Sequence, residues 1–264
     1  MKILVTVSEV SVPVDEFSID GLDIAEQDLQ YELNEWDDYA IEAAVQISEA
    51  YDDVEVVCVT IGPERAEETI RTALAKEVDR AVRVWDDRLA DEGLLDAGTK
   101  AEILAGVVER ENPDLVLSGV QAGDDSLAAT GVTLADEIEY EWAAVVNSLE
   151  FDREEGVASV HRELEGGIEE VAAVEIPAVL TIQTGINEPR YASLRGIRQA
   201  QKKPLDVLGL DDLGVAESAL ESSITVTSMY EPESESDAEI LEGDPDETAE
   251  NLVGLLHNKG VIEG

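Results

Sequence analysis

The 264-residue sequence is poor in the side chains that most often carry catalysis. Its single cysteine, Cys58, excludes an internal disulfide and a metal site built from several cysteines, and its apolar surroundings predict a core residue. The two histidines, His161 and His257, lie far apart without a neighbouring nucleophile or ligand pattern, so we expect both to be structural or exposed. The sequence contains no Walker A motif, and no G-x-G-x-x-G follows its first apolar run.

Long apolar runs are also missing. None approaches the roughly 20 residues that a membrane helix needs. The first residues, from Met1 to Val5, lack a separate apolar region that ends in a small-residue cleavage site, and they are typical of a strand rather than of a secretory signal. We therefore expect no direct membrane insertion and a cytoplasmic location.

Positive charge is scarce, with 17 basic residues against 62 acidic ones and a net charge of −45. Such a surface repels phosphate, which argues against binding to nucleic acid or docking on an anionic membrane. The acidity indicates either attraction to cationic partners or adaptation of the whole surface to very high salt. We favour adaptation in an extreme halophile, because the acids are spread along the chain and 1 M salt screens exposed charges to within about 3 Å.

The first half of the chain alternates between short apolar runs and helical periodicity. Strands are expected at 2–7, 54–61, 81–85 and 115–119, and helices at 37–50, from Gly62 to about Lys76, at 99–110 and at 126–137. A long polar connection is expected between the first strand and the first helix. This alternation predicts an α/β fold with a mostly parallel sheet and helices on both faces.

The pattern changes after residue 140. Strand-like runs at 148–151, 157–163, 168–175 and 178–184 lie close together, and Gly166-Gly167 predicts a tight hairpin. We expect an antiparallel or mixed extension at the sheet edge. The nucleotide-binding domain is expected to span 1–207, and 208–264 to form an acidic arm, in which 231–250 hold ten acids and no base. An amphipathic helix at 248–258 is expected to dock on the same domain or on a partner.

Three turns at the ends of predicted strands are candidate ligand sites: 6–9, 60–62 and 118–125. In an open α/β sheet, ligands bind outside the carboxyl ends of the strands. In the third turn, Gly119 and Gly123 allow close backbone approach, and Gln121 offers amide hydrogen bonds. Asp124 or Asp125 could cap the next helix, whose first turns would favour a phosphate. An ordinary capped turn explains the spacing equally well.

A basic segment stands out against the acidic chain. Residues 189–205 contain no acid and five bases: Arg190, Arg195, Arg198, Lys202 and Lys203. They could serve as internal counter-charge. The local excess favours an exposed contact segment instead, with Tyr191 and Leu194 as anchors among charges.

The most distinctive motifs lie between residues 160 and 203. They are R-x-x-E-G-G-x-E from Arg162, P-A-V-x-T from Pro177 and N-E-P-R-Y-A from Asn187, with further support from 68–75 and from Gln121-Ala122 followed by Asp124-Asp125. In these motifs the chain resembles the beta subunit of electron transfer flavoprotein, over roughly 1–215 and more weakly in the terminal helix. The resemblance implies a Rossmann-like, adenine nucleotide hydrolase-like fold.

The resemblance also implies partners and cofactors. Members pair with a larger alpha subunit that makes most of the FAD contacts. The flavin accepts electrons from dehydrogenases, notably acyl-CoA dehydrogenases, and passes them towards a membrane quinone oxidoreductase. Many beta subunits bury a structural AMP, and in the electron-bifurcating branch a second FAD takes its place.

Site residues follow from the resemblance position by position. The cofactor-binding set is Thr6, Asn34, Trp36, Asp37, Ile61, Gly119, Gln121, Ala122, Asp124, Asp125, Thr130 and Gly131, with Trp36 beside the isoalloxazine ring. The partner-binding set is Arg190, Tyr191, Leu194, Arg195 and Arg198, and Leu194 matches the leucine of the family's recognition loop. Two departures leave the nucleotide open: Asn34-Glu35 replaces the usual Asn-Pro, and residues 126–129 are less polar than in many relatives.

Three functions are compatible with these observations. The leading one is a non-enzymatic electron carrier subunit, which accounts for the missing catalytic side chains. The second is a bifurcating subunit that binds a second FAD and oxidises NADH. The third is a stand-alone adenine-nucleotide-binding regulator, against which the basic segment argues.

Overall fold

The computed structural model describes residues 1–90, 93–231 and 240–262. The chain divides into two compact units, Met1–Met229 and Tyr230–Gly264, which are described separately. Among the described residues, none of the helices has both the length and the hydropathy to cross a bilayer.

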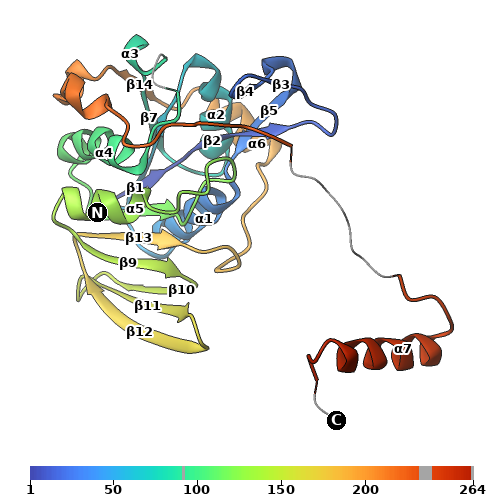
Figure 1. The fold of residues 1–264 in the computed structure, drawn as a ribbon. Coiled ribbons are helices and arrows are strands. Elements are labelled where there is room, and N and C mark those ends of the chain that lie inside the picture. The colour runs from blue at the N-terminus through green and yellow to red at the C-terminus, as the bar shows by residue number, and fades with distance from the viewer. Residues whose placement is uncertain (91–92, 232–239, 263–264) are drawn as a thin grey trace. The chain divides into compact units, whose positions relative to one another are not determined.

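A seven-stranded sheet organises the first unit, and all its strands are parallel (Figure 1). Its order is β14-β7-β6-β1-β8-β13-β9. The strands are β1 (Lys2–Thr6), β6 (Glu55–Ile61), β7 (Arg80–Val84), β8 (Leu115–Gly119), β9 (Glu141–Val146), β13 (Ala178–Ile182) and β14 (Leu205–Leu208). The predicted α/β fold with a mostly parallel sheet is confirmed.

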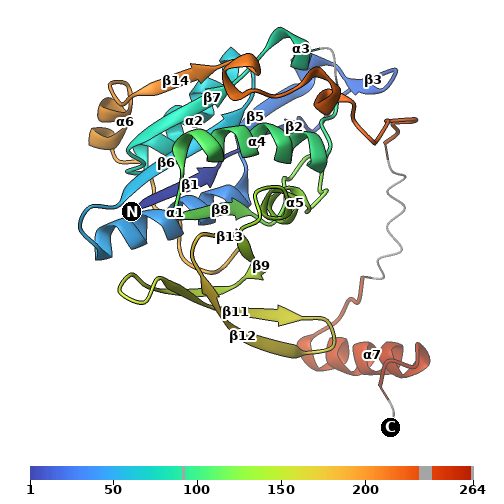
Figure 2. The same cartoon turned by 90° about the vertical axis from the view of Figure 1, so that its left-hand side faces the viewer.

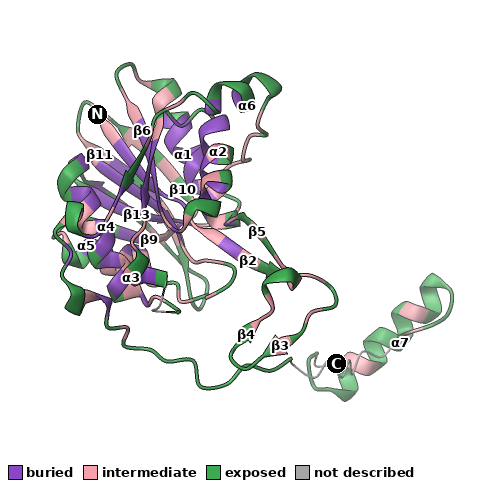
Figure 3. Cartoon of the chain, turned by 90° about the horizontal axis from the view of Figure 1, so that it is seen from above, coloured by how far each residue is buried: buried purple, intermediate pink, exposed green. Residues whose placement is uncertain are grey.

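Helices cover both faces of this sheet because successive strand residues point to opposite sides (Figure 2). In β1, Ile3 and Val5 pack with α1 (Glu35–Ala50) and α2 (Glu67–Ala75). Leu4 packs on the other side with α4 (Ala97–Glu111) and α5 (Thr130–Glu137). Figure 3 shows the buried residues gathered along the strands and on the helix faces beside them.

The segment between β1 and α1 was expected to be a polar connection, and that prediction was wrong. It contains two small antiparallel pairs: β2 (Glu9–Pro13) with β5 (Leu29–Leu33), and β3 (Ile19–Asp20) with β4 (Asp23–Ile24). A 3-10 turn, Glu26–Asp28, precedes β5. The signal was the alternation of apolar and polar residues in β2 and β5, which has the period of a strand with one covered face.

A separate antiparallel sheet follows β9. It consists of β10 (Ser148–Asp152), β11 (Val157–Leu164) and β12 (Ile168–Glu175). The predicted hairpin at Gly166-Gly167 is confirmed, and both glycines have the positive φ that such a turn requires. The placement of residues 178–184 was wrong, because β13 lies inside the parallel sheet between β8 and β9. Every residue of β13 is buried, as expected of a strand covered on both faces.

The first unit continues past residue 207, where its domain was expected to end. Leu208, Leu210, Val215 and Leu220 are buried on the side of α4 and α5. The remaining short elements of this unit are α3 (Asp87–Ala90), α6 (Leu194–Ala200) and the 3-10 turns Glu64–Ala66, Asp211–Leu213 and Glu217–Leu220.

The second unit contains α7 (Pro245–Asn258), which begins three residues before the predicted start. Asp244 caps it, with Glu247 completing a capping box. None of its residues is buried, including the apolar positions Leu252, Val253, Leu255 and Leu256 that were expected to dock. Docking of this helix stays a prediction.

Candidate nucleotide site and contact segment

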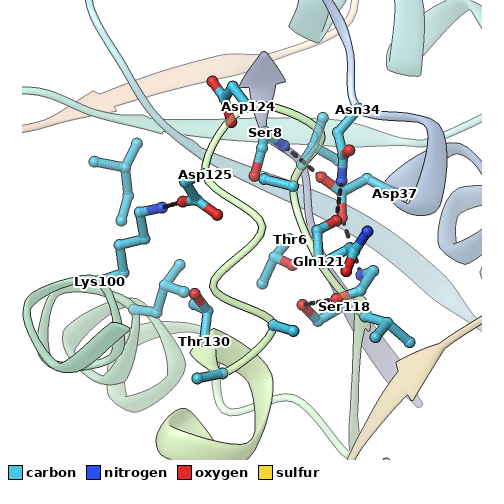
Figure 4. A pocket seen from close by; sticks show the side chains of 18 of the residues that line it. Thr6, Ser8, Asn34, Asp37, Lys100, Ser118, Gln121, Asp124, Asp125 and Thr130 are labelled. Atoms are coloured by element: carbon cyan, nitrogen blue, oxygen red, sulfur yellow. Dashed lines mark hydrogen bonds and ion pairs between the residues drawn. The ribbon is translucent and has the colours of Figure 1, made fainter. Parts of the chain in front are cut away.

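A cavity of about 170 Å³ lies where the strand order reverses (Figure 4). From β1 the chain builds outwards through β6 and β7, then returns to place β8 on the other side of β1. The connections at the carboxyl ends of β1 and β8 diverge there and leave a crevice. Each of the three predicted turns contributes to its lining.

Most of the predicted cofactor residues are brought together in this cavity. Its lining includes Thr6, Asn34, Asp37, Ile61, Gly119, Gln121, Ala122, Asp124, Asp125 and Thr130. Trp36 and Gly131 are not part of it. The half-buried indole of Trp36 donates a hydrogen bond from Nε1 to Gln183 Oε1 at 3.1 Å. Gly131 instead lets α5 approach β13, since a Cβ there would lie 2.6 Å from Thr181 Cγ2.

Asp37 fastens three segments around the cavity. It lies in the first turn of α1, where Asn34 is the N-cap residue and acidic side chains are favoured. Its carboxylate accepts hydrogen bonds from the backbone N–H groups of Ser8, at 2.7 Å, and Gly119, at 2.9 Å. Burial nevertheless raises the pKa of Asp37 to about 6. Gly119 is required by this contact, because a Cβ there would lie 2.6 Å from Asp37 Oδ1.

Asn34 contributes an unpaired hydrogen-bond acceptor to the part of the cavity wall that Asp37 lines. Its Nδ2 donates to the backbone oxygen of Gln121 at 2.8 Å. Its Oδ1 is buried and has no hydrogen-bond partner among the described residues. A buried carbonyl oxygen without a donor is costly. A ligand N–H group would satisfy it.

The loop before α5 differs from the prediction. The helix begins at Thr130 and not at residue 126, because Ser126 and Ala128 have left-handed φ values of 51° and 52°. Neither aspartate caps α5: Asp124 Oδ2 accepts from the backbone N–H of Ser11 at 3.1 Å, and Asp125 Oδ1 accepts from that of Leu127 at 3.0 Å. The loop is therefore tied to β2 and to itself before the helix starts.

Lys100 is a cavity residue that the sequence reasoning missed. It lies on α4, lines the cavity and forms an ion pair with Asp125, on the side opposite Asn34 and Asp37 (Figure 4). It is the one base among the described lining residues. The available signal was its position one turn before Leu104, which also lines the cavity. Glu9, which ends the first predicted turn, has a buried side chain paired with Arg65 Nε at 3.0 Å.

The basic segment divides into internal and exposed residues. Arg190, expected to contact a partner, instead has its guanidinium bound to Glu42 and Glu49 of α1. Lys203 Nζ donates to the backbone oxygens of Leu74 and Val78. The other predicted contact residues, Tyr191, Leu194, Arg195 and Arg198, are exposed. The counter-charge interpretation thus holds for Arg190 and Lys203, whereas a partner contact through the exposed residues stays a prediction.

Comparison with known proteins agrees with the motifs. The sequence profile described as "Electron transfer flavoprotein domain" matches residues 21–213. The electron transfer flavoprotein subunit beta of Methylophilus methylotrophus is 44% identical over 97% of this chain and 98% of its own length. The chain belongs to the electron transfer flavoprotein beta-subunit family. The corresponding subunits of Bacillus subtilis (33% identical, 90% of this chain, 91% of its own) and Sus scrofa (34%, 89% and 87%) are further relatives.

Membership of this family bears on the expected role, partner and cofactor of the chain. An electron carrier subunit rather than an enzyme agrees with these relatives, and a beta subunit of electron transfer flavoprotein implies an alpha subunit and a flavin. The predicted core role of Cys58 is confirmed, since the residue is fully buried and burial raises the pKa of its thiol to about 12.

Proposed function

We propose that this chain is the nucleotide-binding subunit of a heterodimeric electron carrier. With its alpha subunit it holds an FAD that accepts electrons from dehydrogenases, such as the acyl-CoA dehydrogenases of fatty acid oxidation, and passes them to a quinone oxidoreductase. Its own cavity holds AMP. The observation that supports this most directly is the crevice at the switch point, where Asn34 leaves a buried acceptor free and Lys100 supplies a cation.

The cavity residues fit an adenine nucleotide. The orphaned Asn34 Oδ1 can accept an N–H from the exocyclic amino group of adenine, which would satisfy this buried acceptor. The N-terminus of α5 at Thr130 and the ammonium of Lys100 both favour a phosphate.

The acidic residues of the lining oppose this fit less than their number suggests, because each already has a partner. Glu9 pairs with Arg65, and Asp125 pairs with Lys100. Asp37 and Asp124 accept hydrogen bonds from backbone N–H groups. A phosphate entering the cavity therefore meets compensated carboxylates, which reduces the repulsion that the composition alone would suggest.

The chain's contribution to electron transfer is to bind and orient. Bound flavin supplies the electron-accepting chemistry, and Trp36 is the residue of this chain proposed to lie beside its ring. The hydrogen bond from Trp36 to Gln183 fixes that indole at the carboxyl end of β13. No acid–base group is required of this subunit.

Tyr191 and Leu194 form the proposed contact for dehydrogenases. They are 98% and 79% exposed, although both are large and apolar. Arg195 and Arg198 lie beside them, and the segment 189–205 contains no acidic residue that could pair with these arginines. An apolar anchor inside a charged rim is the usual arrangement of an interface hot spot.

The experiment for this function measures electron flow through the intact heterodimer. An acyl-CoA dehydrogenase with its substrate should reduce the bound flavin, and Leu194→Ala should slow this reduction about 10-fold while the cofactor content stays the same. Val207→Ala is the matched control, since Val207 is also exposed but lies on β14 outside the segment. Loss of cofactor from Leu194→Ala would make Leu194 structural, and equal rates would remove it from the contact.

A further inference from the structure

The guanidinium of Arg190 is gripped by two carboxylates of one helix. Nε and Nη2 donate to the two oxygens of Glu42 at 2.7 and 3.0 Å. Nη1 and Nη2 donate to the two oxygens of Glu49 at 2.7 and 3.1 Å. The backbone N–H of Arg190 adds a fifth bond, to Glu42 Oε2 at 3.1 Å. Glu42 and Glu49 are seven positions apart on α1 and therefore share a face. We call this arrangement the Arg190 clamp.

The two halves of the clamp differ in exposure. The side chain of Glu42 is 6% exposed, whereas that of Glu49 is 57% exposed. Gln46 Nε2 donates to Glu42 Oε1 at 2.9 Å and satisfies the buried carboxylate further. Burial opposes the charge of Glu42, but the hydrogen bonds from Arg190 outweigh it and hold the pKa of Glu42 below its usual value. Because a buried pair is screened little by salt, the Glu42 half persists in concentrated salt.

The other end of the segment is fastened to α2. Gly196 packs so closely that a Cβ would lie 2.4 Å from the backbone oxygen of Ala75. Arg71 Nη1 donates to the backbone oxygens of Ala200 and Lys203 at 2.7 and 3.0 Å. The short stretch from Tyr191 to Ser193 is thus held between an anchor on α1 and an anchor on α2.

The exposed anchors adjoin the clamp directly. Tyr191 follows Arg190 in the chain, and Leu194 begins α6, which Ser193 caps by accepting from the N–H of Gly196 at 3.0 Å. A segment that is ordered before binding loses less conformational entropy when a partner takes it. We propose that Arg190 is a positioning residue for partner recognition: clamped on Glu42 and Glu49, it holds Tyr191 and Leu194 in the geometry that the partner binds. This inference rests on the proposed role of the segment.

The test uses the intact heterodimer and an acyl-CoA dehydrogenase with saturating substrate. We expect Arg190→Gln and Glu42→Gln each to raise the apparent KM of the dehydrogenase for the carrier about 10-fold, with kcat changed less than about 2-fold. The double variant should be no worse than either single variant, because both remove the same contact. Amide hydrogen exchange should accelerate in 188–198 and stay unchanged in α2.

Arg88→Gln is the matched control. Arg88 also pairs with two carboxylates, Asp86 at 2.8 Å and Asp211 at 2.9 Å, and it precedes Arg190 by more than 100 positions. The variant Arg88→Gln loses the same positive charge as Arg190→Gln and should leave the KM of the dehydrogenase for the carrier unchanged. Arg190→Lys, which keeps the charge and part of the hydrogen bonding, should recover part of the loss. If Glu42→Gln does not fold, the more exposed Glu49→Gln carries the test, with a smaller rise in KM.

The outcomes separate this inference from the proposed function. If Leu194→Ala raises KM but the clamp variants leave KM and hydrogen exchange unchanged, the clamp has no positioning role. If Leu194→Ala also has no effect, the segment is not the contact and both proposals fail. A rise in KM for Arg88→Gln as large as for Arg190→Gln would assign the effect to net charge and overturn the inference.

Discussion

Asp37 Oδ1 accepts a hydrogen bond from the backbone N–H of Gly119 at 2.9 Å, and this bond joins the first turn of α1 to the carboxyl end of β8. The other oxygen of the same carboxylate accepts from Ser8, just after β1. One buried side chain thereby fixes the two diverging connections that form the crevice. The geometry of the candidate nucleotide site depends on this contact.

Gly119→Ala should open the crevice. The new Cβ would lie 2.6 Å from both Asp37 Oδ1 and Trp36 Cβ, so the start of α1 must move, at a cost of about 2 kcal/mol in the free energy of unfolding. Denaturant unfolding measures this cost. Gly123→Ala in the same loop is the control, because a Cβ there meets nothing within 4 Å. Equal stability of the two variants would contradict the packing argument.

Asp37→Asn should change the pH dependence of stability. The pKa of Asp37 is about 6 in the folded chain and 3.8 without the fold, so the folded state binds the proton more tightly. The contribution of protonated Asp37 to the free energy of unfolding is fully present below about pH 4 and is lost as the pH rises through 6. The total loss is about 3 kcal/mol. Asparagine does not titrate, so this loss should be absent from the variant.

Urea unfolding between pH 5 and 7.5 at constant multimolar KCl compares the two proteins. The difference in unfolding free energy between wild type and Asp37→Asn should shrink as the pH rises. A difference that grows with pH would show that the folded state prefers the charged carboxylate.

Asn34→Ala should weaken nucleotide retention. It removes the buried acceptor that the ligand is proposed to satisfy, together with the bond to Gln121, and should raise the Kd for AMP about 10-fold or more. Asn187→Ala is the control, since Asn187 Oδ1 is also buried, has no hydrogen-bond partner in the described part of the chain, and lies outside the nucleotide cavity. Calorimetric titration with AMP measures both. If both variants bind AMP equally well, Asn34 does not contact the nucleotide.

Removal of salt should loosen the fold. The net charge of −45 repels itself in dilute buffer, and multimolar KCl screens that repulsion. We expect the thermal midpoint to rise by about 10 °C or more between 0.2 and 3 M KCl, as followed by circular dichroism. An unchanged midpoint would remove the halophilic interpretation of the acidity.

Periodicity predicted the strands of the parallel sheet best where both faces are covered. The runs that form β1, β6 and β8 are almost wholly apolar, because a strand that is buried on both faces needs apolar residues at nearly every position. β9 was missed because it begins with the exposed Glu141 and Trp142, which do not resemble a buried strand. β13 was recognised as a strand but placed in the wrong sheet, because pairing partners are set by contacts between distant segments.

The candidate site was predictable at the level of its turns but not of its contacts. Strand ends locate a crevice, and the resemblance named residues within it. The partners of Asp124 and Asp125 depend on β2 and α4, which no local pattern connects to that loop. For Arg190 the local charge excess favoured a partner contact, whereas its carboxylates come from a helix more than 140 positions earlier.

The cofactor stoichiometry of the purified heterodimer tests the central claim most directly. This chain, co-expressed with its alpha subunit in high salt, is extracted with acid, and flavin and adenine nucleotides are quantified per heterodimer. The account predicts one FAD and one AMP, with the AMP lost from Asn34→Ala and the FAD retained. Two FAD and no AMP would favour the bifurcating function, and a stable, colourless assembly of this chain without flavin would contradict the carrier.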